Sequence, residues 1–342
     1  MNDKKPLEII SAITLSDTQI ARIKNVGHPV RLSTYSFKES ANIPAEIWEK
    51  AEVLLSSGRN LPGPELAPNL KWIQITYAGV EPAIKASIVK DKHVTATSAS
   101  GVMISTMGEY ALMALLMLGH KIPEMIQLQQ QCKWGSNASK SLMPVELRGS
   151  TVGIVGYGSI GRQVARLLHP FGAKVLAAKK NVMQPEDKGY TPEGLGDPEG
   201  HFFERLYPIE ALDGMLPECD FVVIALPLTN ATEGMFNREV FAKMKTGAYL
   251  VNLARGGVVN EADLEQALLS GQLGGAVLDV FNQEPLPAES PLWKLPNLII
   301  TPHVSGVSTH LLDDVITLFT ENLKRYLNGQ PLYNVIDPDA GY

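Results

Sequence analysis

The sequence Gly156-Tyr157-Gly158-Ser159-Ile160-Gly161 directly follows the short apolar run Val152–Val155 and begins a helical pattern. In a dinucleotide-binding turn the first glycine allows a tight bend, the second lets a pyrophosphate approach the backbone, and the third lets the helix pack on the strand. The helix N-terminus offers unpaired N–H groups and a positive dipole end to phosphates. Because a strand precedes the turn and a helix follows it, the stretch predicts a dinucleotide site formed by all of these residues except Tyr157.

The next predicted strand, Lys174–Ala178, is followed by basic residues rather than by an acidic one. A site for NAD would place a carboxylate about 20 positions beyond the glycines, where it bonds the ribose 2′-hydroxyl. Lys179 and Lys180 stand there instead, and two ammonium groups favour the 2′-phosphate of NADP. The sequence therefore favours NADP over NAD, with both lysines as cofactor ligands. In the alternative interpretation they are only a solvated strand end, and NAD is possible.

Short apolar runs alternate with helical patterns along nearly the whole chain. This alternation is typical of βαβ units around parallel sheets, so the predicted fold class is α/β. The predicted strands are Glu8–Ala12, Val30–Ser33, Val53–Ser56, Leu70–Ile75, Val152–Val155, Lys174–Ala178, Phe221–Ala225, Ala248–Asn252, Gly275–Val280 and Leu298–Thr301. The most distinct predicted helices are Glu109–Gly119, Ile160–Leu168 and Leu311–Asn328.

The segment Asn181–Tyr207 interrupts this rhythm, since it is rich in Gly, Pro, Asp and Glu and has little periodicity. We expect an extended surface insertion, and loops of this length are uncommon unless they have a function or are mobile. The insertion begins beside the expected 2′-phosphate site. Two roles fit it: covering the adenosine end of the cofactor, or contacting another subunit.

The composition excludes several classes of protein. Hydrophobic residues make up 45% and charged residues 19% of the 342, as in globular proteins. The net charge of -6 argues against general binding to nucleic acid or anionic membranes. Cys132 and Cys219 form no CxxC pair, so neither a disulfide framework nor a metal site is expected. The N-terminus lacks signal-peptide features and the apolar stretch Tyr110–Leu118 is too short to span a membrane, so we expect a cytoplasmic protein.

Seven short motifs share one property: they occur in the order in which a single enzyme family carries them. They are Leu147-Arg148-Gly149, the turn 156–161, Leu226-Pro227-Leu228-Thr229, Met244-Lys245-Thr246-Gly247, Asn252-Leu253-Ala254-Arg255-Gly256-Gly257, Leu278-Asp279-Val280-Phe281 and Thr301-Pro302-His303. Together they resemble the D-isomer-specific 2-hydroxyacid dehydrogenases, in particular glyoxylate/hydroxypyruvate reductases. The resemblance implies two Rossmann-like or flavodoxin-like lobes with parallel sheets and an active-site cleft between them. It assigns residues 1–103 plus 303–342 to a discontinuous substrate-binding domain and residues 104–302 to a dinucleotide-binding domain.

Arg255 follows the predicted strand Ala248–Asn252, at the carboxyl end where open α/β sheets bind ligands. A guanidinium is always charged and can hold a carboxylate and a neighbouring carbonyl oxygen in a fork. It would orient a 2-oxo acid and polarise the C=O group that receives a hydride. By resemblance Arg255 is both catalytic and substrate-binding. The alternative is an arginine paired with a structural carboxylate.

His303 follows the predicted strand Leu298–Thr301, again at a carboxyl edge. Reduction of a carbonyl needs a proton as well as a hydride, and imidazole exchanges protons near neutral pH. Glu284 resembles the family's carboxylate partner, which bonds the other ring nitrogen, fixes the tautomer and stabilises the imidazolium. We therefore predict that His303 exchanges the proton and that Glu284 supports it, with His310 as the reserve candidate.

The resemblance assigns further contacts. Asp279 would accept a hydrogen bond from the nicotinamide carboxamide, although a buried aspartate that caps the following turn is the alternative. The loop Tyr77-Ala78-Gly79-Val80 resembles the substrate-carboxylate loop, in which the backbone N–H groups of Ala78 and Gly79 would bind substrate. The bulky Tyr77 departs from the family's small residues and would narrow the choice of substrate. The remaining cofactor contacts implied by the resemblance are Leu226, Pro227, Leu253 and Ala254.

The predicted activity is hydride transfer between NAD(P)H and C2 of a small 2-oxo or 2-hydroxy acid such as glyoxylate or hydroxypyruvate. The resemblance also implies a homodimer. A rival class is a nucleotide-sensing binding protein, because the carboxyl-terminal binding protein corepressors share this fold. Among enzymes, formate dehydrogenases place an amide where Glu284 stands, so this carboxylate argues against them. Phosphite dehydrogenases stay open as an alternative.

Overall fold

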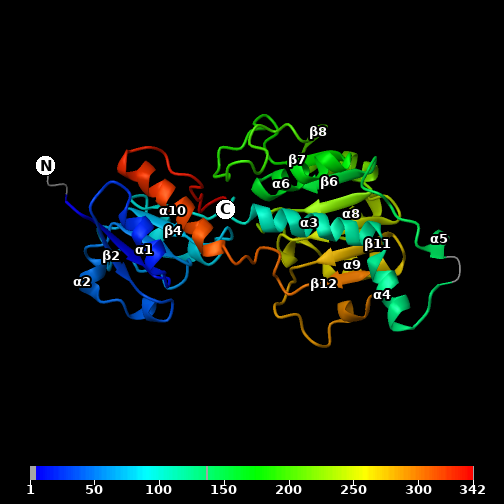
Figure 1. The fold of residues 1–342 in the computed structure, drawn as a ribbon, viewed down its shortest axis with the longest axis horizontal. Coiled ribbons are helices and arrows are strands. Elements are labelled where there is room, and N and C mark those ends of the chain that lie inside the picture. The colour runs from blue at the N-terminus through cyan, green and yellow to red at the C-terminus, as the bar shows by residue number, and fades with distance from the viewer. Residues whose placement is uncertain (1–4, 136–137, 342) are drawn as a thin grey trace. The chain divides into compact units, whose positions relative to one another are not determined.

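A computed structural model describes residues 5–135 and 138–341, and the chain divides into two compact units. The first unit contains the described residues of Met1–Val102, Lys188–Tyr190 and Ser308–Tyr342, and the second contains those of Met103–Asp187 and Thr191–Val307 (Figure 1). This division differs from the predicted one in three places. Met103 lies in the second unit. Residues 303–307, which include His303, also lie in the second unit, and Lys188–Tyr190 from the middle of the insertion belong to the first.

The first unit is built on a parallel sheet of five strands in the order β2-β1-β3-β4-β5, the order found in flavodoxin-like folds. Its strands are β1 (Leu7–Ser11), β2 (Val30–Thr34), β3 (Val53–Ser56), β4 (Trp72–Ile75) and β5 (Thr95–Thr97). Its helices are α1 (Asp17–Lys24), α2 (Ala45–Trp48) and α10 (Leu311–Leu327). Every residue of β3 and β4 is buried, because both faces of these central strands are covered.

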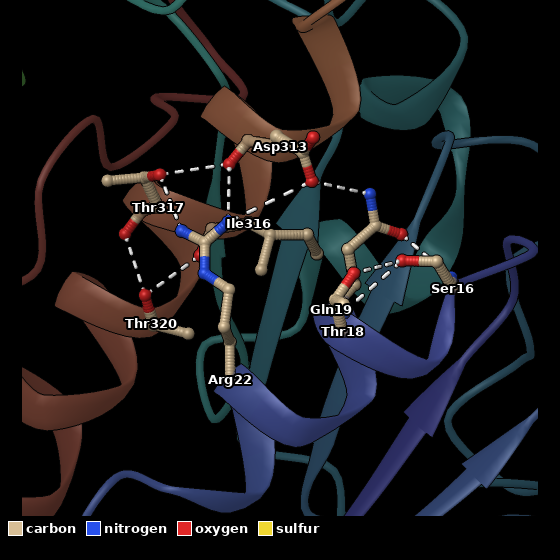
Figure 2. Close-up of polar contacts among 8 residues, drawn as sticks. All are labelled: Ser16, Thr18, Gln19, Arg22, Asp313, Ile316, Thr317 and Thr320. Atoms are coloured by element: carbon tan, nitrogen blue, oxygen red, sulfur yellow. Dashed lines mark hydrogen bonds and ion pairs between the residues drawn. The ribbon is translucent and has the colours of Figure 1, made fainter.

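Helices α1 and α10 come from opposite ends of the chain and lie side by side (Figure 2). Gln19 Nε2 donates to Asp313 Oδ1 at 2.8 Å, and Arg22 donates to the Asp313 carbonyl at 3.3 Å and to Thr317 Oγ1 at 2.7 Å. On the buried side, Ile23 and Ile316 belong to a core formed with alternate residues of the sheet. The C-terminal helix therefore completes the unit that the N-terminal strands begin.

The second unit is built on a parallel sheet of seven strands in the order β12-β11-β10-β9-β6-β7-β8. Its strands are β6 (Thr151–Val155), β7 (Lys174–Lys179), β8 (Arg205–Pro208), β9 (Phe221–Ile224), β10 (Ala248–Asn252), β11 (Leu273–Leu278) and β12 (Leu298–Ile300). Its helices are α3 (Ile104–Gly119), α4 (Ile122–Gln130), α5 (Ala138–Ser141), α6 (Ser159–Leu168), α7 (Leu212–Met215), α8 (Arg238–Lys243) and α9 (Glu261–Leu269).

Helices cover both faces of this sheet. Helices α3 and α6 pack together on one face (Figure 1), where Gly108 lets the two helices approach closely. Helices α7, α8 and α9 contribute to the core on the other face. All four residues of β9 are buried, which explains why its sequence is a continuous apolar run without alternation.

The structure confirms the predicted α/β class and all ten predicted strands, whose ends agree within two residues. Helix α3 begins five residues before the predicted start, at Ile104. The prediction that the insertion extends to Tyr207 without regular structure is wrong, because β8 pairs with β7 from Arg205 onward. This strand is short and only Tyr207 is buried in it, so it carries no apolar pattern. Strand β5 was also not predicted. Within the described ranges, none of the helices combines the length and apolarity needed to cross a membrane.

The insertion contributes Lys188–Tyr190 to the first unit through close packing. The backbone N–H of Tyr190 donates to Asn334 Oδ1 at 3.0 Å, and its ring packs edge-on against Tyr333. Gly101 has φ +86°, and a Cβ atom there would collide with the carbonyl of Tyr190. Glycine is therefore required at this contact for two separate reasons.

Candidate active site

Most predicted site residues lie at one edge of the seven-stranded sheet, because parallel strands all end at the same edge. They are Gly156–Gly161 after β6, Lys179 and Lys180 at the end of β7, Leu226 and Pro227 after β9, Leu253, Ala254 and Arg255 after β10, Asp279 and Glu284 after β11, and His303 after β12. The strand order reverses between β6 and β9, and open α/β sheets bind ligands at such a point. Ala78 and Gly79 follow β4, at the equivalent edge of the other sheet.

The three glycines of the turn after β6 have different surroundings. Gly156 has φ +107°, and a Cβ atom there would collide with the backbone of Ala225. A Cβ atom on Gly161 would collide with the carbonyl of Gly156, so helix and strand pack closely. A Cβ atom on Gly158 would meet nothing within 4 Å, and no side chain caps the N-terminus of α6. This open space at the N-terminus of α6 fits the pyrophosphate of a dinucleotide.

Lys179, at the end of β7, is held by the insertion. Its Nζ donates to the carbonyl oxygens of Gln184 at 2.6 Å and Glu186 at 3.3 Å. Burial lowers the pKa of this ammonium, and the nearby charge of Arg162 lowers it further. An ammonium has three hydrogens, so one stays available for a further acceptor. Lys180 is exposed.

Arg255 lies in a short loop whose backbone is held by hydrogen bonds from the side chain of Asn252. Asn252 is 1% exposed; its Nδ2 donates to the Arg255 carbonyl at 3.1 Å, and its Oδ1 accepts from the Ala254 N–H at 3.1 Å. A Cβ atom on Gly256 would collide with the backbone of Phe281. The loops after β10 and β11, which carry Arg255 and Glu284, are therefore in close contact.

His303 and Glu284 form the pair that the sequence predicts. His303 Nδ1 lies 2.7 Å from Glu284 Oε2, and the Phe281 N–H donates to Glu284 Oε1 at 2.9 Å. Both carboxylate oxygens are thus engaged, which fixes the carboxylate toward the ring. Because Oε2 is an acceptor, Nδ1 carries a hydrogen and Nε2 is the ring nitrogen that can exchange a proton. The His303 side chain is 48% exposed.

Asp279 is completely buried and holds the loop after β12. Its Oδ1 accepts from Thr301 Oγ1 at 2.6 Å and from the Val304 N–H at 2.9 Å, and its Oδ2 accepts from the Ser305 N–H at 2.8 Å. His303 lies inside this loop with φ +54°, a left-handed conformation that is unfavourable for a residue with a side chain. Asp279 is therefore buried, as in the alternative interpretation, but it caps the loop after β12 rather than the turn that follows it in the sequence. Its contact with nicotinamide stays a prediction.

Three buried polar residues of this unit were given no role in the sequence analysis. Asn252 fixes the Arg255 loop. Tyr110, on α3, bonds Thr301 Oγ1 at 2.6 Å, and burial raises the pKa of its hydroxyl to about 12. Arg162, on α6, is 1% exposed. For Asn252 and Tyr110, a polar residue inside an apolar strand or helix is the signal that could have drawn attention to them. Within the described ranges, no group of three or more potential ligand side chains could hold a metal ion.

Residues 112–305 match the family model described as D-isomer specific 2-hydroxyacid dehydrogenase, NAD binding domain. A human protein named glyoxylate reductase/hydroxypyruvate reductase is 35% identical over 266 residues, which cover 77% of this chain and 76% of that protein. The chain therefore belongs to the D-isomer-specific 2-hydroxyacid dehydrogenase family, as the motifs predicted.

Solved structures agree with this assignment. A D-isomer specific 2-hydroxyacid dehydrogenase from Xanthobacter autotrophicus Py2, in complex with NADPH and MES, has a TM-score of 0.81 at 27% identity and covers 99% of this chain and 100% of its own. An NADPH-dependent glyoxylate/hydroxypyruvate reductase from Sinorhizobium meliloti, in complex with NADP and sulfate, has a TM-score of 0.75 at 26% identity, with 99% and 100% covered. The protein is an NAD(P)-dependent dehydrogenase that transfers a hydride between its cofactor and C2 of a small 2-oxo or 2-hydroxy acid. These relatives do not favour the rival interpretation as a nucleotide-sensing binding protein.

Proposed function

We propose that this protein reduces glyoxylate, hydroxypyruvate or a similarly small 2-oxo acid, with NADPH as the preferred cofactor. The observation that carries the proposal is the His303–Glu284 pair, in the same unit as Arg255 and the open glycine turn. The human and Sinorhizobium relatives, whose names contain this activity, support the choice of substrate. The NADPH- and NADP-bound relatives and the two lysines at the end of β7 support the choice of cofactor.

His303 supplies the proton. Its Nε2–H donates to the oxygen on C2 while that carbon is reduced, and Glu284 stabilises the imidazolium through Nδ1. Because Glu284 is itself fixed by the Phe281 N–H at 2.9 Å, the ring keeps one orientation through the reaction. The bound cofactor would supply the hydride from its nicotinamide ring.

Arg255 holds the substrate. Its guanidinium binds the carboxylate and the neighbouring carbonyl oxygen, so that the carbonyl is polarised and its carbon faces the hydride. By resemblance, the backbone N–H groups of Ala78 and Gly79 would bind substrate, and Tyr77, which is 50% exposed, would favour small substituents on C2.

The cofactor would be held by residues of the second unit alone. The pyrophosphate would lie on the space beside Gly158 and on the first N–H groups of α6, at Ser159 and Ile160. Lys179 and Lys180 would bind the 2′-phosphate. The other cofactor contacts we propose are Leu226, Pro227, Leu253, Ala254 and, for the nicotinamide carboxamide, Asp279.

The test is a set of initial rates with NADPH and NADH for glyoxylate, hydroxypyruvate, pyruvate and a branched 2-oxo acid. We expect the two small substrates and NADPH to give the highest kcat/KM. Lys179→Asp should shift the preference toward NADH, whereas the control Lys174→Asp, at the exposed opposite end of β7, should leave it unchanged. Absence of turnover with every 2-oxo acid would overturn the proposed substrate class, and equal cofactor ratios in Lys179→Asp and parent would overturn the lysine argument.

We also propose that the protein is a homodimer, as the family resemblance implies. Met113 on α3 is 43% exposed, and other apolar side chains of this region are also exposed; they are Met125, Ile126, Trp134 and Met143. Such side chains are typical of surfaces covered by a partner. Light scattering coupled to size exclusion should give twice the mass of the 37.2 kDa chain, and a monomeric mass would contradict this proposal.

A further inference from the structure

Four consecutive residues of the insertion, Gln184–Asp187, are held from two sides by cations of the second unit. Lys179 Nζ donates to the carbonyls at positions 184 and 186, at 2.6 Å and 3.3 Å. Arg162 takes the intervening positions: its Nη2 donates to the Pro185 carbonyl, and its Nε lies 3.5 Å from Asp187 Oδ2. Alternate residues of the segment are therefore bound by alternate cations, one from β7 and one from α6.

The Arg162 side chain is buried and is held by several contacts. It directly follows Gly161 of the glycine turn and is 1% exposed. Its Nη1 donates to the Asp197 carbonyl, and its guanidinium carbon lies 4.8 Å from the centre of the Tyr157 ring. A buried charge is tolerated only when it is paired and bonded, and such a group holds its partners in one arrangement.

A second contact ties the insertion to the glycine turn. Tyr157 Oη donates to Asp197 Oδ2 at 2.6 Å, and the N–H groups of His201 and Phe202 donate to the same carboxylate at 2.8 Å and 3.1 Å. Burial alone would raise the pKa of Asp197, but these three hydrogen bonds and the charge of Arg162 hold its pKa below the ordinary value. Asp197 is thus a charged acceptor that keeps the insertion folded against the turn.

We propose that Arg162 is a positioning residue that sets the selectivity for NADPH over NADH. Arg162 holds the segment Gln184–Asp187 in place. The backbone carbonyls of this segment in turn hold Lys179 Nζ in the position where it would bind the 2′-phosphate. An unrestrained lysine has many rotamers, and ordering it at the moment of binding weakens the affinity. The insertion therefore serves the adenosine end of the cofactor through Lys179. This inference rests on the proposed NADPH preference and names the residue that creates it.

The test is Arg162→Met, with the Kd values of NADPH and NADH measured by fluorescence titration without substrate. Loss of the Arg162 contacts with Pro185 and Asp187 should raise the Kd of NADPH about tenfold. This is the effect typical of losing one ordered charged contact. The Kd of NADH should change less than about threefold, because NADH has no 2′-phosphate for Lys179 to meet. At saturating NADPH, kcat should stay close to that of the parent, because Arg162 touches neither His303 nor Arg255.

Two further variants separate positioning from general stability. Arg205→Met removes the contact of another arginine with a tyrosine ring, at 5.6 Å from Tyr207, and should leave both Kd values unchanged. Asp187→Asn keeps the shape of the segment but removes the negative charge that faces Arg162 and acts on Lys179. It should lower the NADPH/NADH selectivity about twofold to threefold, a partial loss of one charged contact. It also serves if Arg162→Met does not fold.

The outcomes are distinct. Equal rises of both Kd values in Arg162→Met, or an unchanged selectivity ratio in Asp187→Asn, would overturn the positioning role while NADPH-dependent reduction stands. A parent enzyme that binds NADH as tightly as NADPH would instead overturn the proposed cofactor preference, and this inference with it.

Discussion

Replacing Asp279 by asparagine should destabilise the second unit even without any ligand. The side chain is completely buried and accepts three hydrogen bonds, from Thr301 Oγ1 and from the N–H groups of Val304 and Ser305. An amide has one oxygen, and its best orientation keeps that oxygen toward the two donors that share Oδ1. The amide NH₂ then faces the Ser305 N–H, so that two donors meet.

The magnitude follows from these three bonds. An unpaired buried donor costs about 1–3 kcal/mol, and each remaining bond loses its charge-assisted part, about 1 kcal/mol. Relief from burying a charge offsets some of this loss. We therefore expect a net destabilisation of roughly 2–4 kcal/mol. In a unit of this size each kcal/mol lowers the melting temperature by about 2–4 °C, so the expected fall is roughly 5–15 °C.

The assay is calorimetry of the cofactor-free protein. The matched control is Asp220→Asn, because Asp220 is partly exposed and its asparagine can keep the bond from the Thr151 N–H at 2.8 Å while losing only Lys245. This control should lose less than about 1 kcal/mol. If cofactor-free Asp279→Asn melts within 2 °C of the parent, as a mere cofactor ligand would, the capping role is refuted.

Gly158→Ala should leave the free energy of unfolding nearly unchanged but raise the Kd of NADPH by at least about tenfold, since the methyl group enters only the space for the pyrophosphate. Gly156→Ala should lower the free energy of unfolding by more than about 1 kcal/mol, because φ at this residue is +107°. In Glu284→Gln the amide faces His303 Nδ1 and favours the wrong ring tautomer, so kcat should fall roughly 10²–10⁴-fold with a native circular dichroism spectrum; a fall under tenfold would contradict the assigned role. Because its folded pKa is lowered, Asp197 contributes stability that is present above its ordinary pKa of 3.8 and lost as the pH falls below it. Asp197→Asn should flatten this acid-limb loss in thermal melts, and an identical pH profile would show that the carboxylate is not responsible.

The sequence alone predicts ten of the twelve strands in the described ranges and the sheet edge at which most predicted site residues lie. Strand β9 and the first four residues of β10 are continuous apolar runs because both faces of these strands are buried, and this pattern can be recognised locally. Parallel strands end at one edge, so residues that follow them in the sequence, such as Arg255 and His303, gather there. Strand β8 was missed because an edge strand with one buried residue has no such pattern.

Only the tertiary structure shows which polar groups are hydrogen-bonded to which partners. Asp279 lies directly after β11, yet its partners follow β12, and only the packing of adjacent loops shows that it caps them. Arg162 is charged and lies on an amphipathic helix, where sequence gives no reason to expect burial. Its partners Pro185 and Asp187 are more than twenty residues away in a segment without periodicity. Hydrogen bonds of this kind join residues that are far apart in the sequence, so they leave no local sequence pattern. Strands and turns depend on residues that are close in the sequence, so they can be predicted from it.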